Sequence, residues 1–375
     1  MPVALPSPAQ ANCTTSGTTT TCDSSPPNPY TTTIGTGSST ASGTTVNLGT
    51  NAQVVLGDAN AISLGDNATI TVGGGGLVQN SGVSSGGLYG LGPNTIEFNS
   101  NGRLTVQAGG TVYASCSRFN GEAVNPVGSG NVIDNFGTIR SDSAVPIVFN
   151  SAFGRNTVIN EAGGVIQASS PSSIAIKSNG SAIDFTNMGT VIGSVVFSGH
   201  GSDTFNAVTG SSVTGTIDGG SGSGNNTLTM SGSGTGTMSS VLANWATVLK
   251  QDSGTWTMTG NNTYTGTTVV HAGVLIVNGS IASSSLTTVN SGAALFGTGT
   301  VGSTVVIPGG FLIPGNSPGT LTVSGNLALQ SGAFYIVQVT PTTASTTNVS
   351  GPPRLPAPWG ASLRRAVMSR AATPF

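Results

Sequence analysis

Residues 51–73 read NAQVVLGDANAISLGDNATITVG, in which three to five alternating residues are followed each time by Gly and by Asn or Asp. Alternation of apolar and polar residues over so short a run indicates a β-strand, and Gly beside Asn or Asp indicates a turn. The stretch therefore predicts three short strands joined by turns. Such units must stack on one another, because none of them can bury an apolar face alone.

The strand-and-turn unit recurs along the rest of the chain. A Gly followed by a β-branched pair begins at Gly110, Gly137, Gly164 and Gly189. Similar phrases begin at Gly273, Gly292, Gly310 and Gly332, where the spacing is shorter. The repeat length falls from 27 residues between Gly110 and Gly137 to 18 residues between Gly292 and Gly310. A repeat of this length, built from strands and turns, predicts a solenoid. A β-sandwich is the alternative, but it would not produce a slowly drifting period.

We therefore expect an all-β fold, a right-handed parallel β-helix. Val, Ile and Leu should form apolar ladders inside, and Ser, Thr and Asn should line the hydrated outside. Asn and Gly at the corners should adopt left-handed backbone conformations, and Asn135, Asn160 and Asn187 stand just ahead of three of the Gly phrases.

The composition excludes several classes of protein. Charged residues are 6% of the 375 residues, against roughly 25% in an ordinary soluble domain. Amphipathic helices with charged outer faces cannot be built from two Lys and three Glu residues. The chain has no basic patch for nucleic acid and no apolar run of about 20 residues that could form a membrane-spanning helix. With 36% hydrophobic residues and a net charge of −2, it does not resemble a disordered chain either.

The N-terminal segment carries an export signature. Residues 1–11 are interpreted as the remnant of a secretory signal, since Ala9-Gln10-Ala11 fits the small-x-small cleavage rule, with an ordinary Pro/Ala-rich end as the alternative. Cys13 and Cys22 follow in a Thr/Ser-rich leader or cap, residues 12–45. We expect them to form a small disulfide loop in an oxidising compartment; two free thiols are the alternative. Cys116 is left over as an unpaired thiol.

The C-terminal third contains two specific phrases. Residues 254–266 read GTWTMTGNNTYTG, and residues 314–320 read PGNSPGT. They resemble the passenger-associated repeat of Gram-negative autotransporters, with Met258 where the family usually has Leu. The residues that carry the resemblance, and to which it gives a structural role, are Trp256, Asn262, Tyr264, Gly266, Pro314, Gly315, Asn316, Pro318 and Gly319.

The resemblance implies a secreted, surface-exposed passenger that is carried to the outer membrane by a C-terminal β-barrel, which this chain lacks. It also implies that residues 251–351, the repeat and its C-terminal coils, support the folding and secretion of the β-helix formed by residues 46–250. The aromatic residues of this region are expected to form a buried ladder that gives it the densest apolar burial: Trp256, Tyr264, Phe296, Phe311, Phe334 and Tyr335.

The C-terminal end of the chain differs from everything before it. Residues 352–375 contain four Arg and no acidic residue, whereas residues 1–351 contain six basic and twelve acidic residues. We interpret residues 352–375 as an unrelated tail produced by a frameshift near residue 351, with a natural Pro/Arg-rich tail as the alternative.

Candidate chemistry is sparse. His200, Ser202 and Asp203 have the residue types of a catalytic triad, but neighbours on one turn cannot form a hydrogen-bonded relay. The same stretch, with Asn226 in the next repeat, matches the calcium-binding nonapeptide of β-rolls, although calcium needs more carboxylates than these. His271 is expected at an outward or corner position, and the Cys and His residues have no metal-ligand spacing. A polysaccharide-cleaving site would need charged residues grouped on one face, and only one set could qualify, although solvated loops explain it better: Arg103, Arg118, Glu122, Asp134, Arg140, Asp142, Arg155 and Glu161.

The sequence thus favours a non-enzymatic adhesive or structural surface protein without cofactor or metal, whose partners are unidentified molecules of host or neighbouring cells. The alternatives are a β-helical carbohydrate-active enzyme and a truncated product without function. A groove lined by the charged cluster would favour the enzyme, and a uniform Ser/Thr surface would favour the stalk.

Overall fold

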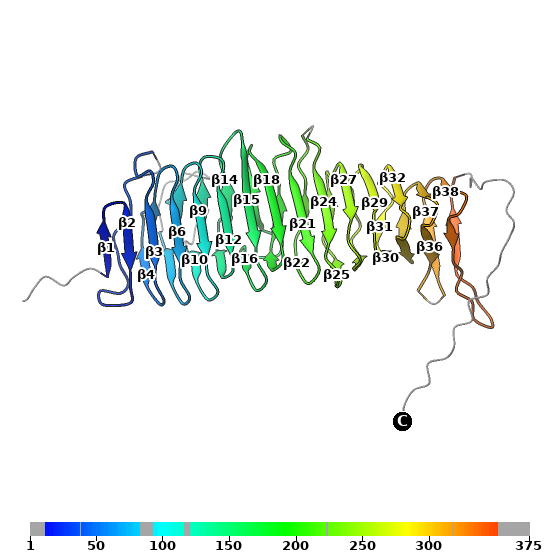
Figure 1. Ribbon diagram of the computed structural model, residues 1–375, viewed down its shortest axis with the longest axis horizontal. Helices are drawn as coiled ribbons and strands as arrows, with labels where there is room; N and C mark the ends of the chain where they lie inside the picture. The colour runs from blue at the N-terminus through cyan, green and yellow to red at the C-terminus, as the bar shows by residue number, and fades with distance from the viewer. Residues whose placement is uncertain are drawn as a thin grey trace, which may run out of the picture.

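The computed structural model describes residues 12–37, 39–82, 93–115, 121–222, 224–316 and 318–351. These residues form a parallel β-solenoid of about 13 turns in which no helix occurs. The coils follow one another along the long axis of the molecule, from β1 and β2 at one end to β36–β38 at the other (Figure 1). The expected signal remnant (residues 1–11), Cys116, Arg118 and the tail (residues 352–375) lie outside the described residues.

One sheet runs the whole length of the solenoid. Sheet A consists of β1 (Cys13–Ser16), β2 (Thr19–Cys22), β3 (Thr45–Leu48), β6 (Thr69–Val72), β9 (Arg103–Val106), β12 (Val132–Asn135), β15 (Arg155–Asn160), β18 (Ala182–Asn187), β21 (Thr204–Val208), β24 (Thr227–Ser231), β27 (Thr247–Lys250), β29 (Thr267–Val270), β32 (Leu286–Val289), β35 (Thr304–Val306) and β38 (Leu327–Leu329), in this order. Among these strands, only the β1–β2 pair is antiparallel.

Two further sheets complete the coils of the N-terminal part. Sheet B consists of β4 (Gln53–Leu56), β7 (Leu77–Asn80), β10 (Thr111–Ala114), β13 (Thr138–Ser141), β16 (Val165–Gln167), β19 (Thr190–Ile192) and β22 (Ser212–Val213). Sheet C consists of β5 (Ile62–Ser63), β8 (Ile96–Phe98), β11 (Val124–Pro126), β14 (Ile147–Phe149), β17 (Ile174–Ser178), β20 (Ser194–Val196), β23 (Ile217–Asp218) and β26 (Leu242–Ala243).

Two other sheets take over in the C-terminal part. Sheet D consists of β25 (Thr235–Met238), β28 (Thr255–Met258), β30 (Val274–Val277), β33 (Ala294–Gly297), β36 (Phe311–Pro314) and β39 (Phe334–Tyr335). Sheet E consists of β31 (Ser280–Ile281), β34 (Thr300–Val301), β37 (Thr320–Val323) and β40 (Thr346–Val349).

The repeat phrases of the sequence lie in stacked strands, which confirms the predicted solenoid. The longer N-terminal spacing places Thr111 beside Thr138 and Thr138 beside Val165, all in sheet B. The shorter C-terminal spacing places Val274 beside Ala294, and Ala294 beside Phe311, in sheet D. The drift of the period is therefore a real shortening of the coils.

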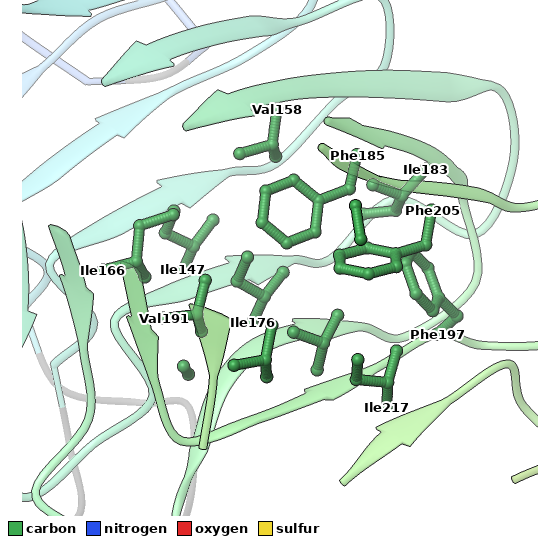
Figure 2. Close-up of a cluster of buried hydrophobic side chains, with 14 of the residues drawn as sticks. Ile147, Val158, Ile166, Ile176, Ile183, Phe185, Val191, Phe197, Phe205 and Ile217 are labelled. Carbon is green, nitrogen blue, oxygen red and sulfur yellow. The ribbon is translucent and has the colours of Figure 1, made fainter. Parts of the chain in front are cut away.

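Strand after strand alternates outward and buried residues, as a parallel solenoid requires. In β30, for example, Leu275 and Val277 are fully buried while Val274 and Ile276 face outward. The buried residues form one continuous hydrophobic cluster from Cys22 to Leu329. Figure 2 shows its middle, where Phe185 and Phe205 of adjacent coils approach to 5.1 Å between ring centroids.

A ladder of buried asparagines runs through one corner of the solenoid. The Nδ2 of Asn135 donates to Oδ1 of Asn160 at 2.8 Å, and the Nδ2 of Asn160 donates to Oδ1 of Asn187 at 2.9 Å. All three residues are 0% exposed. They lack positive φ angles, so the expectation of left-handed corner residues is wrong for these three; it holds for Asn51, Asn67, Asn101 and Asn244. The amides of these residues point inward and form hydrogen bonds between neighbouring coils, and this role does not require a left-handed backbone conformation.

The predicted buried aromatic ladder is wrong for three of its six members, and a fourth, Tyr335, is only partly buried against the core. Trp256 and Tyr264 are buried, but Phe296, Phe311 and Phe334 face outward, and Phe334 is 50% exposed. Leu275, Leu295 and Leu312 take the inward positions of their strands, which pushes the neighbouring aromatics to the surface. Large buried rings lie instead in the N-terminal part: Phe98, Phe149, Phe185 and Phe205.

Candidate functional site

The residues of the first repeat phrase join adjacent coils. The indole Nε1 of Trp256 donates to the backbone carbonyl of Ser231 at 3.0 Å. Oδ1 of Asn262 accepts from the backbone N–H of Leu242 at 2.9 Å, while its Nδ2 donates to the carbonyl of Ser280 at 3.0 Å. Asn262 is therefore a hydrogen-bonded link between the coil before it and the coil after it.

Tyr264 and Gly266 complete this corner. Tyr264 is buried, its hydroxyl lies 2.7 Å from Oγ1 of Thr268, and burial raises its pKa above the usual value. A Cβ on Gly266 would lie 2.2 Å from the carbonyl oxygen of Ala246, so only glycine fits against the neighbouring coil. These contacts give the phrase a role in packing.

The second phrase forms a turn after β36. Pro314 is the last residue of that strand and points inward, and Gly315 adopts a φ of 89°. The backbone N–H of Gly315 donates to the carbonyl of Gly297 at 2.8 Å, and Nδ2 of Asn316 donates to Oδ1 of Asn278 at 3.3 Å. Pro318 and Gly319 lead into β37, and a Cβ on Gly315 would lie 2.3 Å from the backbone N of Gly319.

Cys13 and Cys22 are joined by a disulfide at the N-terminal end of the solenoid. They are register partners in the antiparallel pair β1–β2. Because β2 pairs with β3, this disulfide-closed hairpin covers the first edge of sheet A.

The triad candidates do not form a relay. His200 and Ser202 are exposed, whereas Asp203 is 0% exposed and faces the interior. Oδ1 of Asp203 accepts from the backbone N–H of Ile183 at 2.7 Å, and the backbone N–H of Asp203 donates to Oδ1 of Asn226 at 2.8 Å. Asp203 and Asn226 thus occupy equivalent corner positions and bind the backbone of the preceding coil.

The calcium interpretation finds no support in this corner. Burial raises the pKa of Asp203, with backbone N–H groups opposing the shift. In the described ranges, no group of three or more His, Cys, Asp or Glu residues could share a metal ion. His271 is exposed, as expected, with Nδ1 3.2 Å from Nδ2 of Asn290.

The charged cluster considered from sequence is dispersed over three sheets. Arg103 and Asp134 form an ion pair on sheet A, as do Arg155 and Asp184. Arg140 lies on sheet B, and the nearly buried Glu122 lies beside sheet C, where burial raises its pKa. The described part of the chain does not gather these residues in one groove.

Sequence reasoning missed Lys250. It is 0% exposed, and its Nζ donates to the carbonyls of Gln251, Asp252 and Ala272 at 2.7, 2.8 and 2.9 Å. Burial lowers its pKa. The alternation in TVLK, with Val248 inward, was the available signal, since it places the lysine on the buried face.

A shallow surface groove of about 320 Å³ lies where sheet B ends and sheet D begins. Its lining is small and mostly hydroxyl-bearing: Gly210, Ser211, Ser212, Thr235, Gly236, Thr237 and Ser239. Such a lining offers hydrogen bonds but no acid, base or nucleophile pair.

Comparison with known proteins points to one class. Residues 248–277 match the passenger-associated-transport-repeat family. The chain is 40% identical over 90 residues to an extracellular serine protease of Serratia marcescens, which is 24% of this chain and 8% of that protein. It is also 40% identical over 82 residues to the adhesin BmaC autotransporter of Brucella suis biovar 1 (strain 1330), or 21% of this chain and 2% of that protein.

The matched segments are thus less than a tenth of the length of these relatives. No solved structure matches the chain. Among the described residues, no helix is long and apolar enough to cross a bilayer.

Proposed function

We propose that this chain is a secreted or surface-displayed passenger that acts without catalysis. The transport repeat, the distant relatives and the parallel solenoid together support an autotransporter passenger. Its role is that of an adhesin-like or structural stalk. The observation that carries the proposal is the placement of the repeat residues: Trp256, Asn262 and Tyr264 all make contacts within the solenoid wall.

The distribution of polar groups supports a non-catalytic role. A hydrolytic site needs an acid, a base or a nucleophile within hydrogen-bond reach of one another. Asp203 binds the backbone of the neighbouring coil, and Arg103 and Arg155 are neutralised by aspartates. The Serratia relative is named as a protease, but the shared segment is a small part of that protein.

Residues 251–351 are proposed to support folding of the coils before them. Their coils are short, so contacts between neighbouring strands close small loops and form at low entropic cost. Gly266 against Ala246 and Asn262 against Leu242 tie the repeat to the coil that precedes it. A folded repeat would therefore offer the preceding coil a strand edge with which to pair.

Two measurements test the proposal on the purified full-length chain. Beads coated with the protein should attach to epithelial cell monolayers more than albumin-coated beads do, and the protein should release no reducing ends from polysaccharides. Release of sugar ends that depends on protein concentration would overturn the non-enzymatic assignment.

Refolding kinetics test the role of the repeat. Gly266→Ala should slow refolding, whereas Gly137→Ala, which places a Cβ 2.3 Å from the carbonyl of Gly110 in the N-terminal coils, should chiefly accelerate unfolding. The reverse pattern would contradict a folding role for residues 251–351.

A further inference from the structure

One column of planar polar side chains interrupts the short side chains on the outer face of sheet B. Gln79 is the register partner of Tyr113, Tyr113 of Arg140, and Arg140 of Gln167. The four residues therefore project from four consecutive coils on the same face. We call them the Arg140 ladder. The column beside it consists of Leu77, Thr111, Thr138 and Val165.

Arg140 differs from the other described arginines because it has no carboxylate partner among the described residues. Arg103 and Arg155 each pair with an aspartate of the next coil. Arg140 instead lies over the ring of Tyr113, with its Cζ 3.7 Å from the ring centroid. Within the described ranges, no carboxylate oxygen lies within 4.0 Å of its guanidinium nitrogens.

Asp142 is engaged elsewhere. The hydroxyl of Tyr113 donates to its carboxylate, and burial and this bond both raise the pKa of Tyr113, so the hydroxyl keeps its proton. The aspartate thus anchors the tyrosine that supports Arg140. The result is a guanidinium that stacks on the ring of Tyr113 and that has no carboxylate partner in the part of the chain that the structure describes.

The geometry suits a carboxylate on an extended sugar chain. A guanidinium binds a carboxylate through two parallel N–H donors, and stacking on an aromatic ring fixes the plane of those donors in advance. Gln79 and Gln167 lie one on each side of the Tyr113–Arg140 pair. Nε2 of Gln79 donates one hydrogen bond to Oγ of Ser115 at 2.9 Å, which leaves its second N–H and its carbonyl for sugar hydroxyls, and the amide of Gln167 can donate to and accept from them as well. With strands about 4.8 Å apart, the ladder spans about 14 Å along the solenoid axis, enough for a few sugar units.

We propose that the Arg140 ladder binds an extended polysaccharide in which carboxylate-bearing sugars alternate with neutral ones. A densely charged chain fits less well, because the ladder offers one unpaired cation and Asp142 lies beside it. The proposal rests on the proposed function and assigns a ligand class to it.

Hyaluronan oligosaccharides provide the probe, since every second sugar carries a carboxylate; dextran is the neutral control and heparin the sulfated one. Binding to the immobilised full-length chain should be measured for wild type, Arg140→Gln, Arg140→Lys and Arg155→Gln. Arg155→Gln is the matched control, because its guanidinium is paired and lies on sheet A.

Wild type should bind hyaluronan and not dextran. Arg140→Gln should weaken binding about tenfold or more, a loss of one charge-assisted pair. Arg140→Lys should bind with intermediate affinity, and Arg155→Gln should bind like wild type. Circular dichroism checks that each variant is folded.

Equal binding by wild type and Arg140→Gln, equal binding of dextran, or Arg140-dependent binding of heparin without hyaluronan would each overturn the assignment. Attachment of protein-coated beads to cells in that case would leave the proposed adhesive function standing, so the two failures are distinguishable.

Discussion

The buried asparagine ladder offers a sharp test of how the coils are held together. Asn160 is its middle member: its Nδ2 donates to Oδ1 of Asn187 at 2.9 Å and to the carbonyls of Gly164 and Thr190, both at 3.3 Å. Its Oδ1 accepts from Nδ2 of Asn135 at 2.8 Å. Asn160→Asp is nearly isosteric, yet it replaces a donor amide with a group that, when ionised, can only accept.

The expected loss follows from these contacts. The two N–H groups of the amide, which are shared among three acceptors, disappear, and each contributes about 1 kcal/mol net. Oδ1 of Asn187 is left buried without this donor. We expect the free energy of unfolding to fall by about 3 kcal/mol or more at pH 7.

The loss should depend on pH in a defined direction. Burial would raise the folded-state pKa of the new carboxyl above its unfolded value of about 3.9. The folded state then holds its proton more tightly, so stability is highest below pH 4 and falls as pH rises through the folded-state pKa. A protonated carboxyl can also donate one hydrogen bond again, so the variant should lie closer to wild type at pH 4 than at pH 7.

Urea unfolding followed by far-ultraviolet circular dichroism measures both effects. Asn206→Asp is the matched control, because Asn206 faces outward from β21 and, among the described residues, its Oδ1 accepts only from Oγ of Ser231. A loss below about 1 kcal/mol for Asn160→Asp, a loss equal to that of Asn206→Asp, or a loss independent of pH would refute the reasoning.

Three further outcomes are expected. Gly266→Ala should lower the free energy of unfolding, measured by chemical denaturation, by several kcal/mol, because its Cβ would meet the carbonyl oxygen of Ala246 at 2.2 Å. Gly57→Ala is the control, since its Cβ would meet nothing within 4 Å and should leave stability unchanged. Equal effects of the two substitutions would contradict the packing role of Gly266. Because the pKa of Asp203 is raised, its contribution to stability is present below pH 4 and is lost as pH rises through the folded-state pKa. Asp203→Asn should therefore flatten the pH dependence of the melting temperature above pH 4. An unchanged pH profile would contradict this role of Asp203. Lys250→Met should lower stability by about 2 kcal/mol in urea titrations, because three carbonyls lose their donor; a more stable variant would mean that the buried charge outweighs those bonds.

The stacking of coils could be read from the sequence because each repeat phrase begins with a glycine at the same position of its strand. Thr111, Thr138 and Val165 follow such glycines and become register partners. The spacing between equivalent phrases is fixed by the length of one coil, so it can be recognised in the sequence without knowledge of the side-chain contacts.

The direction of individual side chains was harder to predict. Phe296 and Phe311 were expected inside, but alternation is decided by which residue starts a short strand, and Leu295 and Leu312 already occupied the inward positions. Aligning those leucines with Leu275, their partner in the ladder, would have placed the aromatics outside.

Contacts across coils were beyond the reach of local patterns. Arg140 and Tyr113 belong to successive coils, and Lys250 meets the carbonyl of Ala272 from the next coil. Their partners become visible only once the register of the coils is known.

The in-register solenoid itself is tested most directly by distances between spin labels on sheet A. Thr69 to Thr204 spans five strand steps, from β6 to β21, and Thr69 to Thr267 spans eight, from β6 to β29. At about 4.8 Å per step, pulsed electron paramagnetic resonance on the Cys116→Ser background should give about 24 Å and about 38 Å between the labelled backbones. Distances that do not grow in proportion to the number of coils, as in a β-sandwich, would contradict the account.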